Sequence, residues 1–213
     1  MSSDPPNASP SRGADLPPAD PGLAELVRLR GAPLLDALES HLPGSRVHAE
    51  AAGSYAFAAA VGIGLDRTAA ELCRETAKLH DVGMVYVPAA TARTPFESWD
   101  SEQRAAFEAH YDAGAQLALG AGIPDDVCGW LLQIRERFDG AGTDGIAGST
   151  IPVASRLARA ACACDTLLAS AHGGESLEER RLDAIERLRG AAGRELDPRV
   201  VEALVATLAS PSC

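Results

Sequence analysis

The sequence has few aromatic residues, no excess of basic side chains and no long apolar run. Aromatic residues make up only 4% of the 213 residues, so the core must be built from Ala, Leu and Val, which favours closely packed helices over stacked sheets. The formal net charge of −11 argues against nucleic-acid and anionic-membrane partners, because phosphate surfaces would repel the chain. Neither a membrane span of roughly 20 apolar residues nor a signal-peptide pattern is found.

Cysteine is scarce, and its spacing matches neither a zinc knuckle nor a disulfide framework. The five cysteines are an odd number, and reduced thiols are the expectation for a chain without an export signal. We therefore expect a cytoplasmic protein. The sequence also lacks a Gly-x-Ser-x-Gly nucleophile elbow, and no other nucleophile constellation is evident.

The pattern of apolar residues divides the chain into three parts. Residues 1–21 are rich in Pro, Ser, Asp and Ala and have little to bury, so they are predicted to be a disordered tail. Residues 22–43 form a predicted N-terminal helical extension that is interrupted at Gly31 and Pro33. Residues 44–210 form the predicted main domain. The fold class predicted for the whole is an all-α helical bundle.

Helical periodicity and end signals place the elements of the main domain. A helix over residues 45–61 is predicted to carry one stripe of Val47, Ala51, Tyr55 and Ala58. Asp66 is the predicted N-cap of the next helix, which ends near Gly83. Residues 85–87 lean towards a β-strand, and residues 89–99 are predicted to form a loop. Further helices are expected from 100 or 101 to about 117, from 124 to about 134, and over 152–170, 176–190 and 197–209.

Two local features carry candidate chemistry. His80 and Asp81 end a mostly apolar helix, and such a pair can ligate a divalent metal if other helices supply His48 and His110. Taken alone, the pair fits a solvent-facing or capping role as well. The glycine-rich loop over 139–145 lacks the Lys-Ser/Thr of a P-loop and the acid spacing of an EF-hand, so alone it is a plain turn.

Read in order, the motifs resemble those of HD-GYP proteins, a branch of the HD-domain phosphohydrolases. The resemblance covers roughly residues 44–206. Its motifs are Leu79-His80-Asp81-Val82-Gly83-Met84 (L-H-D-I-G-K in the family), His110-Tyr111-Asp112-Ala113-Gly114 (H-P-x-x-G), Glu136-Arg137-Phe138-Asp139-Gly140-Ala141-Gly142 (E-R-W-D-G-S-G), Ile151-Pro152 with Arg156-Leu157, and Leu196-Asp197-Pro198 (F-D-P). The resemblance implies an HD-domain-like helical bundle from a bacterial signalling protein. It further implies two or three iron or manganese ions and hydrolysis of cyclic di-GMP.

The candidate site departs from the family pattern. His48, His80, Asp81 and His110 fall on metal-ligand positions. Other positions have changed: the paired histidines are Ile134-Arg135, the later aspartate ligand is Cys162, the lysine is Met84, and the G-Y-P signature has shrunk to Gly142-Thr143. The surviving ligands suit one divalent ion, Fe or Mn by resemblance, with Cys162 as a candidate fourth ligand. The alternative is that the domain binds no metal.

Arg135 has two open interpretations. It could bind phosphate together with Asp139, Gly140 and Gly142, taking over the charge role of a missing metal. Alternatively, it faces solvent or pairs with Glu136 or Asp139.

Three functions follow from the sequence. The favoured hypothesis is a degenerate HD-GYP domain that binds a cyclic dinucleotide, another phosphate ligand or a separate signalling protein. The second is an active single-metal phosphohydrolase, in which Asp81 would be the catalytic candidate. The third is a purely structural interaction domain.

Overall fold

The computed structural model describes residues 21–94, 98–170 and 176–209, which form helices and contain no β-strand. The α-helices are α1 (Pro21–His41), α2 (Ser45–Gly62), α3 (Arg67–Lys78), α4 (Ala89–Ala92), α5 (Ser101–Gly120), α6 (Asp125–Leu132), α7 (Val153–Ala169), α8 (Leu177–Ala191) and α9 (Pro198–Ala209). The 3₁₀ helices are η1 (Val82–Tyr86), η3 (Gln133–Arg135) and η4 (Gly148–Thr150). The predicted all-α class is confirmed. Nearly all of the predicted tail, residues 1–21, lies outside the described residues, as does residue 210.

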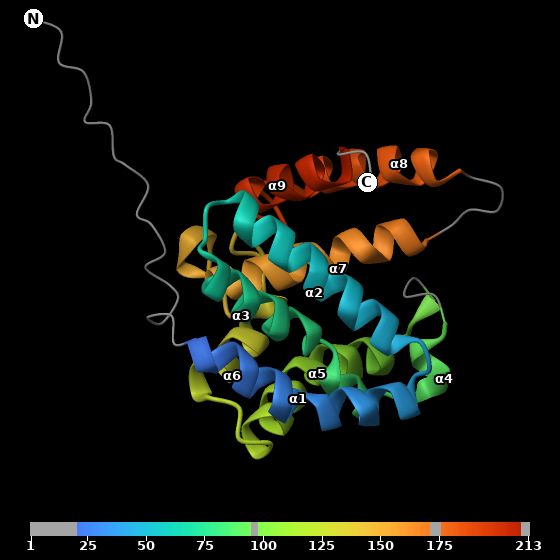
Figure 1. Ribbon diagram of the computed structural model, residues 1–213. Coiled ribbons are helices and arrows are strands. Elements are labelled where there is room, and N and C mark those ends of the chain that lie inside the picture. Colours follow the sequence, from blue (N-terminus) through green and yellow to red (C-terminus); the bar gives the residue numbers. More distant parts are fainter. Residues whose placement is uncertain (1–20, 95–97, 171–175, 210–213) are drawn as a thin grey trace, which may run out of the picture.

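Helices α2, α3 and α7 form the centre of the bundle. Helix α2 packs against α3, α7 and α9, and α3 also packs against α7. Figure 1 shows α8 and α9 side by side at one end of the molecule and α1 at the other. One hydrophobic core joins buried residues of all these helices. Residues on α2, after α3 and on α7 are therefore brought close together although they are far apart in sequence. In the part of the chain that is described, no helix is long and apolar enough to cross a bilayer.

The buried face of α2 consists of very small residues. Its buried positions are Ala49, Ala52, Gly53, Ala56, Ala59 and Ala60. The predicted stripe is wrong in register, because Val47 is 75% exposed. Only small residues fit on this face, because the neighbouring helices approach closely: a Cβ on Gly53 would lie 2.6 Å from Lys78 Cγ of α3.

Helix α1 runs without the predicted interruption. Pro33 lies inside it, although a proline removes one helical hydrogen bond. Gly31 faces the core, where an added Cβ would lie 2.7 Å from Leu79 Cδ2. Burial of Val27, Leu35 and Leu38 on the same helix compensates for the lost hydrogen bond, so tertiary packing overrides local propensity.

The segment after the His80-Asp81 motif also differs from its prediction. Residues 85–87 do not form a strand, because residues 82–86 wind into η1, where the Met84 N–H donates to Asp81 O at 2.8 Å. The segment predicted as a loop over 89–99 contains the short helix α4. The helix predicted to end near Gly83 ends at Lys78 instead, because residues 79–81 form a turn that leads into η1. Its predicted start is confirmed. Asp66 caps α3 by accepting the Ala69 N–H at 2.9 Å.

Candidate metal centre and ligand cavity

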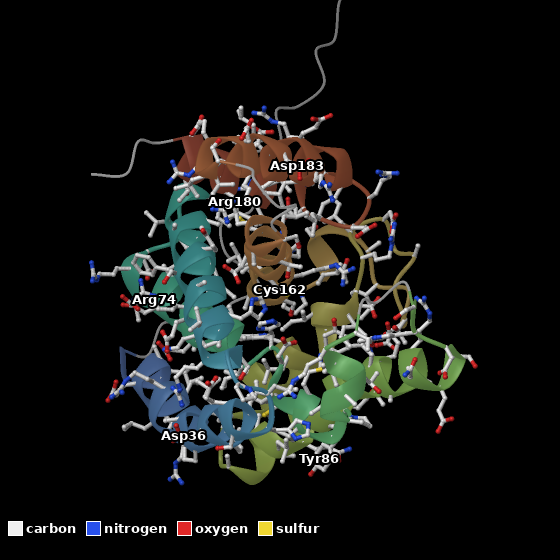
Figure 2. All side chains as sticks on the ribbon, turned by 90° about the vertical axis from the view of Figure 1, so that its right-hand side faces the viewer. Asp36, Arg74, Tyr86, Cys162, Arg180 and Asp183 are labelled. Carbon is white, nitrogen blue, oxygen red and sulfur yellow. The ribbon has the colours of Figure 1, made fainter. Side chains whose placement is uncertain are left out.

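The structure brings the predicted metal ligands together. His48 lies on α2, His80 and Asp81 lie in the turn after α3, His110 on α5 and Cys162 on α7. Figure 2 shows Cys162 near the middle of the molecule. The Nε2 atoms of His48 and His80 are 3.1 Å apart, and Cys162 Sγ lies 3.7 Å from His48 Nε2. The donor atoms of His48, His80 and Cys162 all lie within 4.8 Å of one another.

The Nδ1 atom of each of the three histidines lies against a protein acceptor. The acceptors are an Asp165 carboxylate oxygen for His48, at 2.6 Å, the main-chain oxygen of Ala77 for His80, at 2.8 Å, and the main-chain oxygen of Phe107 for His110. An acceptor at this position fixes the ring orientation and places the proton on Nδ1. The Nε2 atoms thereby face the interior of the site, where a metal would bind them once their protons are released.

The Asp81 carboxylate lies between the histidines. Its Oδ2 is 3.2 Å from His80 Nε2 and 3.8 Å from His48 Nε2, and its Oδ1 is 3.6 Å from His110 Nε2. His110 Nε2 is buried and has no hydrogen-bond partner. Convergent nitrogen, oxygen and sulfur donors with an unsatisfied ring nitrogen beside them fit one divalent cation.

The site holds its charge in ionised pairs. The hydrogen bond to Asp165 raises the pKa of His48 to about 9. Burial is the largest single influence and alone would lower the pKa of His80 and raise that of Asp81. Their mutual attraction, together with Cys162 beside His80 and His110 beside Asp81, outweighs burial and shifts both pKa values the other way. Burial would likewise raise the pKa of Cys162, yet the charge of His80 and hydrogen bonds from His48 and His80 lower it to about 6. A cation would replace the protons that these histidines carry.

A second metal position lacks donors. Within the described ranges, His110 and Asp81 are the two donors on that side of the site. Ile134, at one of the family's paired-histidine positions, is 2% exposed and packs in the hydrophobic core. Two donors are too few for a stable site of the kind that holds iron, manganese or zinc.

Arg135 is engaged by acidic side chains. Its Nη1 lies 2.8 Å from Asp112 Oδ2 and its Nη2 lies 3.0 Å from Asp144 Oδ2, with Glu136 Oε1 at 4.0 Å from Nε. The side chain is only 12% exposed. The structure therefore shows ion pairing of Arg135, and a phosphate would have to displace a carboxylate to reach it.

The glycine-rich loop is organised by contacts of its own. Asp139 pairs with Arg137 and also accepts the Ala141 N–H, and these contacts, led by the Arg137 hydrogen bond, lower its pKa to about 2. Gly140 has a φ of +80°, and a Cβ on Gly142 would lie 2.7 Å from the Arg137 main-chain nitrogen. The tight turn therefore requires these two glycines. Gly142 also lines a hollow together with Arg135.

A cavity of about 650 Å³ opens beside the metal centre. Its walls include His48, His80, Asp81, Cys162, Trp99, Phe107, Tyr111 and Arg159. The rings of Trp99 and Phe107 meet edge to face with centroids 5.4 Å apart. The volume lies in the range typical of small-molecule sites, and the aromatic wall suits a flat ring.

Arg159 is a site residue that the sequence does not single out, and Asp165 is marked by the sequence only as the second acid of the family's D-x-x-D motif, whose first acid is Cys162 here. Arg159 Nη1 donates to Ile134 O at 3.0 Å, its Nε is buried without a hydrogen-bond partner, and no carboxylate of the described residues is seen to pair with it. Both residues lie three positions from Cys162 on α7, so helical spacing would have placed them near its face.

Comparison with known proteins identifies the family. The family model for the HD domain matches residues 34–200. The chain belongs to the HD domain family. This finding confirms the superfamily that the motifs predicted. HD-domain phosphohydrolases bind divalent metals, and the His48, His80 and Cys162 cluster of this HD domain lies where its motif residues converge.

Relatives of this HD domain include cyclic dinucleotide phosphodiesterases. It is 30% identical over 147 residues to the cyclic di-GMP phosphodiesterase response regulator RpfG of Xanthomonas campestris pv. campestris, covering 67% of this chain and 38% of that protein. It is 24% identical over 181 residues to the 3'3'-cGAMP-specific phosphodiesterase 2 of Vibrio cholerae, covering 81% of this chain and 33% of that protein. The chain thus spans little more than a third of these relatives.

Solved structures share the fold. An HDG"Y"P protein of Bdellovibrio bacteriovorus, Bd1817, superposes with a TM-score of 0.65 at 21% identity, covering 88% of this chain and 61% of that one. The HD domain of the L. monocytogenes phosphodiesterase PgpH, in complex with cyclic-di-AMP, gives a TM-score of 0.58 at 17% identity, covering 83% of this chain and 95% of that one. At these identities the likeness establishes the all-α HD architecture.

Proposed function

We propose that this HD domain binds a phosphate-bearing nucleotide of the cyclic dinucleotide class and does not hydrolyse it. The observation that carries the proposal is the single donor cluster: His48, His80 and Cys162, with Asp81 beside the two histidines, suit one ion, and the second position has two donors. Two-metal phosphoryl transfer stabilises the attacking and the leaving oxygen with separate ions. Without the second ion, binding is favoured over turnover.

The cavity supports a nucleotide as the ligand. Its volume of about 650 Å³ accommodates a small nucleotide, and Trp99, Phe107 and Tyr111 offer ring faces and edges for a base. Arg159 supplies positive charge on the same wall, and a guanidinium binds phosphate oxygens through two parallel N–H groups. The named relatives act on cyclic di-GMP and cGAMP, which supports this ligand class.

The residues of the site divide into two tasks. His48, His80, Asp81 and Cys162 would hold one divalent ion, with Asp165 orienting the His48 ring. Such an ion would add positive charge to the cavity wall that these residues line. Arg159 binds the phosphate, and the aromatic wall positions the base. The proposal places the phosphate on Arg159 rather than Arg135, whose guanidinium already meets two carboxylates.

The glycine-rich loop over residues 139–145, predicted to bind phosphate, borders the proposed ligand site without forming its main contacts. Gly142 and Arg135 line the adjoining hollow, which shares Arg159 with the main cavity. Asp139 and Gly140 shape the turn behind it. A larger ligand would extend from the main cavity into this hollow.

Calorimetric titration with cyclic di-GMP, cGAMP and cyclic di-AMP tests the proposal. We expect saturable binding of at least one of them and no product by chromatography when iron, manganese or zinc is supplied. Arg159→Ala should weaken binding. Arg189→Ala on α8, which removes an exposed ion pair with Glu202 on α9, should not. Hydrolysis that is abolished by His80→Ala would contradict the proposal, as would the absence of binding.

A single-metal phosphohydrolase is the second candidate function. It is favoured by the contact of 2.6 Å between His48 and Asp165, which orients a metal-ligating ring in the way an active centre needs. Restoring the family's acid by Cys162→Asp should then raise metal affinity or phosphatase activity. If it changes neither, this candidate loses its support.

A purely structural interaction domain makes a different prediction. Replacing His48 and His110 together should then leave the thermal stability unchanged with and without added manganese. A metal site predicts instead that the metal-dependent increment in stability is lost.

A further inference from the structure

We infer that the centre is a thiolate site for a zinc-like cation, with Cys162 as a ligand beside His48, His80 and Asp81, rather than an iron or manganese site. The inference rests on the proposed single-metal centre and names its metal class. It is carried by the positions of four donor atoms and by the chemistry of sulfur.

Three of the donor atoms, on His48, His80 and Cys162, lie within 4.8 Å of one another, and an Asp81 oxygen lies beside two of them. Bonds of about 2.0–2.3 Å to zinc in a tetrahedron place neighbouring donors about 3.4–3.6 Å apart. The observed separations are 3.1 Å between the Nε2 atoms of His48 and His80, and 3.7 Å between His48 Nε2 and Cys162 Sγ. Asp81 Oδ2 lies 3.2 Å and 3.8 Å from the two ring nitrogens. The Asp81 carboxylate therefore adjoins the histidine side of the cluster, and it would have to turn towards an ion held by His48, His80 and Cys162 to become the fourth ligand.

Sulfur changes which ion the set prefers. Thiolate is a soft ligand that selects zinc and similar ions, whereas carboxylate and water suit manganese. Two imidazoles, one thiolate and one carboxylate form a donor set of the kind that binds zinc. Cys162 therefore changes the chemistry of the site.

The geometry also offers a fourth ligand from the protein, Asp81. Structural zinc sites are filled by four protein ligands, and catalytic ones keep a position for water or substrate. With Asp81 turned towards the ion as the fourth donor, this centre would be of the filled kind, its ligands coming from α2, the turn after α3 and α7. Zinc would tie three segments of the bundle together, and the phosphate would be left to Arg159.

Cobalt substitution tests the inference directly. The chain of 213 residues, freed of metal by a chelator and kept reduced, is titrated with Co²⁺ and followed by absorption spectroscopy. We expect a near-ultraviolet sulfur-to-cobalt charge-transfer band and the intense visible bands of four-coordinate cobalt, at one ion per chain. The band should be absent in Cys162→Asp and present in Cys164→Ala, whose thiol is fully buried two residues along α7.

Competition between zinc and manganese gives the second readout. The preference for zinc over manganese should be lower in Cys162→Asp than in the unmodified chain and unchanged in Cys164→Ala. Circular dichroism confirms that each variant is folded. Cobalt binding without the charge-transfer band, or an equal zinc preference in both chains, would overturn the inference.

These failures can be told apart from failure of the proposed function. Nucleotide binding without turnover could persist when the sulfur band is missing, in which case only the thiolate site is wrong. Hydrolysis of a cyclic dinucleotide would refute the proposed function, whatever the cobalt spectrum shows. A chain that binds none of the three metals would refute the thiolate site, and nucleotide titration would still decide the rest.

Discussion

The ring of His48 is held from both sides by α7. Asp165 lies at its Nδ1 and Cys162 approaches its Nε2. One of these neighbours is placed to orient the ring and the other to share a cation with it. The side chains of His48 and Asp165 are 24% and 18% exposed, so their contact is only partly screened by water.

Asp165→Asn tests the orienting contact. The amide keeps the shape but loses the charge, so we expect zinc affinity to fall about 10- to 100-fold, as is typical when a carboxylate behind a ligating histidine is lost. Asp183→Asn, which alters an exposed pair with Arg187 on α8, is the matched control. Calorimetry measures both, and equal affinities would remove Asp165 from the site.

His110 and His80 should respond differently to substitution. His110→Ala removes a ring whose Nε2 is 3.6 Å from Asp81 Oδ1, and we expect one zinc per chain to remain. His80→Ala removes a ligand of the filled centre, and its zinc affinity should fall by more than about 100-fold. Metal analysis of the purified variants measures this. Loss of zinc in the His110 variant would show that a second ion position matters.

The turn between α3 and α5 is fixed by a close helix contact. A Cβ on Gly83 would lie 1.9 Å from His110 O and 2.6 Å from the Gly114 nitrogen. Both atoms belong to the backbone of α5 and cannot move aside. The glycine after the His80-Asp81 motif therefore lets the motif turn rest directly on the helix that carries His110.

Gly83→Ala should lower the free energy of unfolding by about 1–3 kcal/mol, because overpacking against backbone forces the helices apart. Gly129→Ala is the control within α6, since nothing lies within 4 Å of its added Cβ. There the helix propensity of alanine should raise stability by about 0.5–1 kcal/mol. Urea denaturation measures both, and similar effects would refute the close contact.

The helices and the metal ligands could be predicted from sequence because each depends on local or positional information. Asp66 starts a helix through its own side chain, and His80 and Asp81 are recognised by their place in a motif. Arg159 could not be assigned in this way, since its role depends on which carboxylates fail to reach it. The partners of Arg135, Asp112 and Asp144, likewise come together only in the folded chain.

Some elements were mispredicted where packing opposes local preference. Val85 and its neighbours favour a strand, but the described residues offer no strand to pair with, and the chain winds into η1 instead. Pro33 lies within α1 because the helix buries Val27 before the proline and Leu35 and Leu38 after it. Such outcomes depend on contacts distant in sequence.

The metal centre joins segments that are far apart along the whole chain. His48 and Cys162 are separated by 114 positions, and α2 and α7 are packed together in the middle of the bundle (Figure 1). A ligand that binds only the folded arrangement stabilises it against unfolding. Zinc should therefore act on the entire fold.

Thermal unfolding should show this effect. At a free zinc concentration of 100 times the dissociation constant, we expect a gain of about 2.7 kcal/mol in unfolding free energy, reversed by a chelator. His80→Ala should lose the zinc-dependent gain. Differential scanning calorimetry measures it, and an unchanged melting temperature on adding zinc would contradict a metal centre in the native fold.

The alanine face of α2 has a consequence for how this chain can vary. Alanine has no side-chain torsion to freeze, so burying Ala52, Ala56, Ala59 and Ala60 costs almost no side-chain entropy. Nothing but glycine is smaller, so nearly every substitution there adds atoms to a close-packed interface. Related sequences can therefore vary at the exposed positions of α2, whereas at its buried alanines almost every substitution introduces a larger side chain and overpacks the interface.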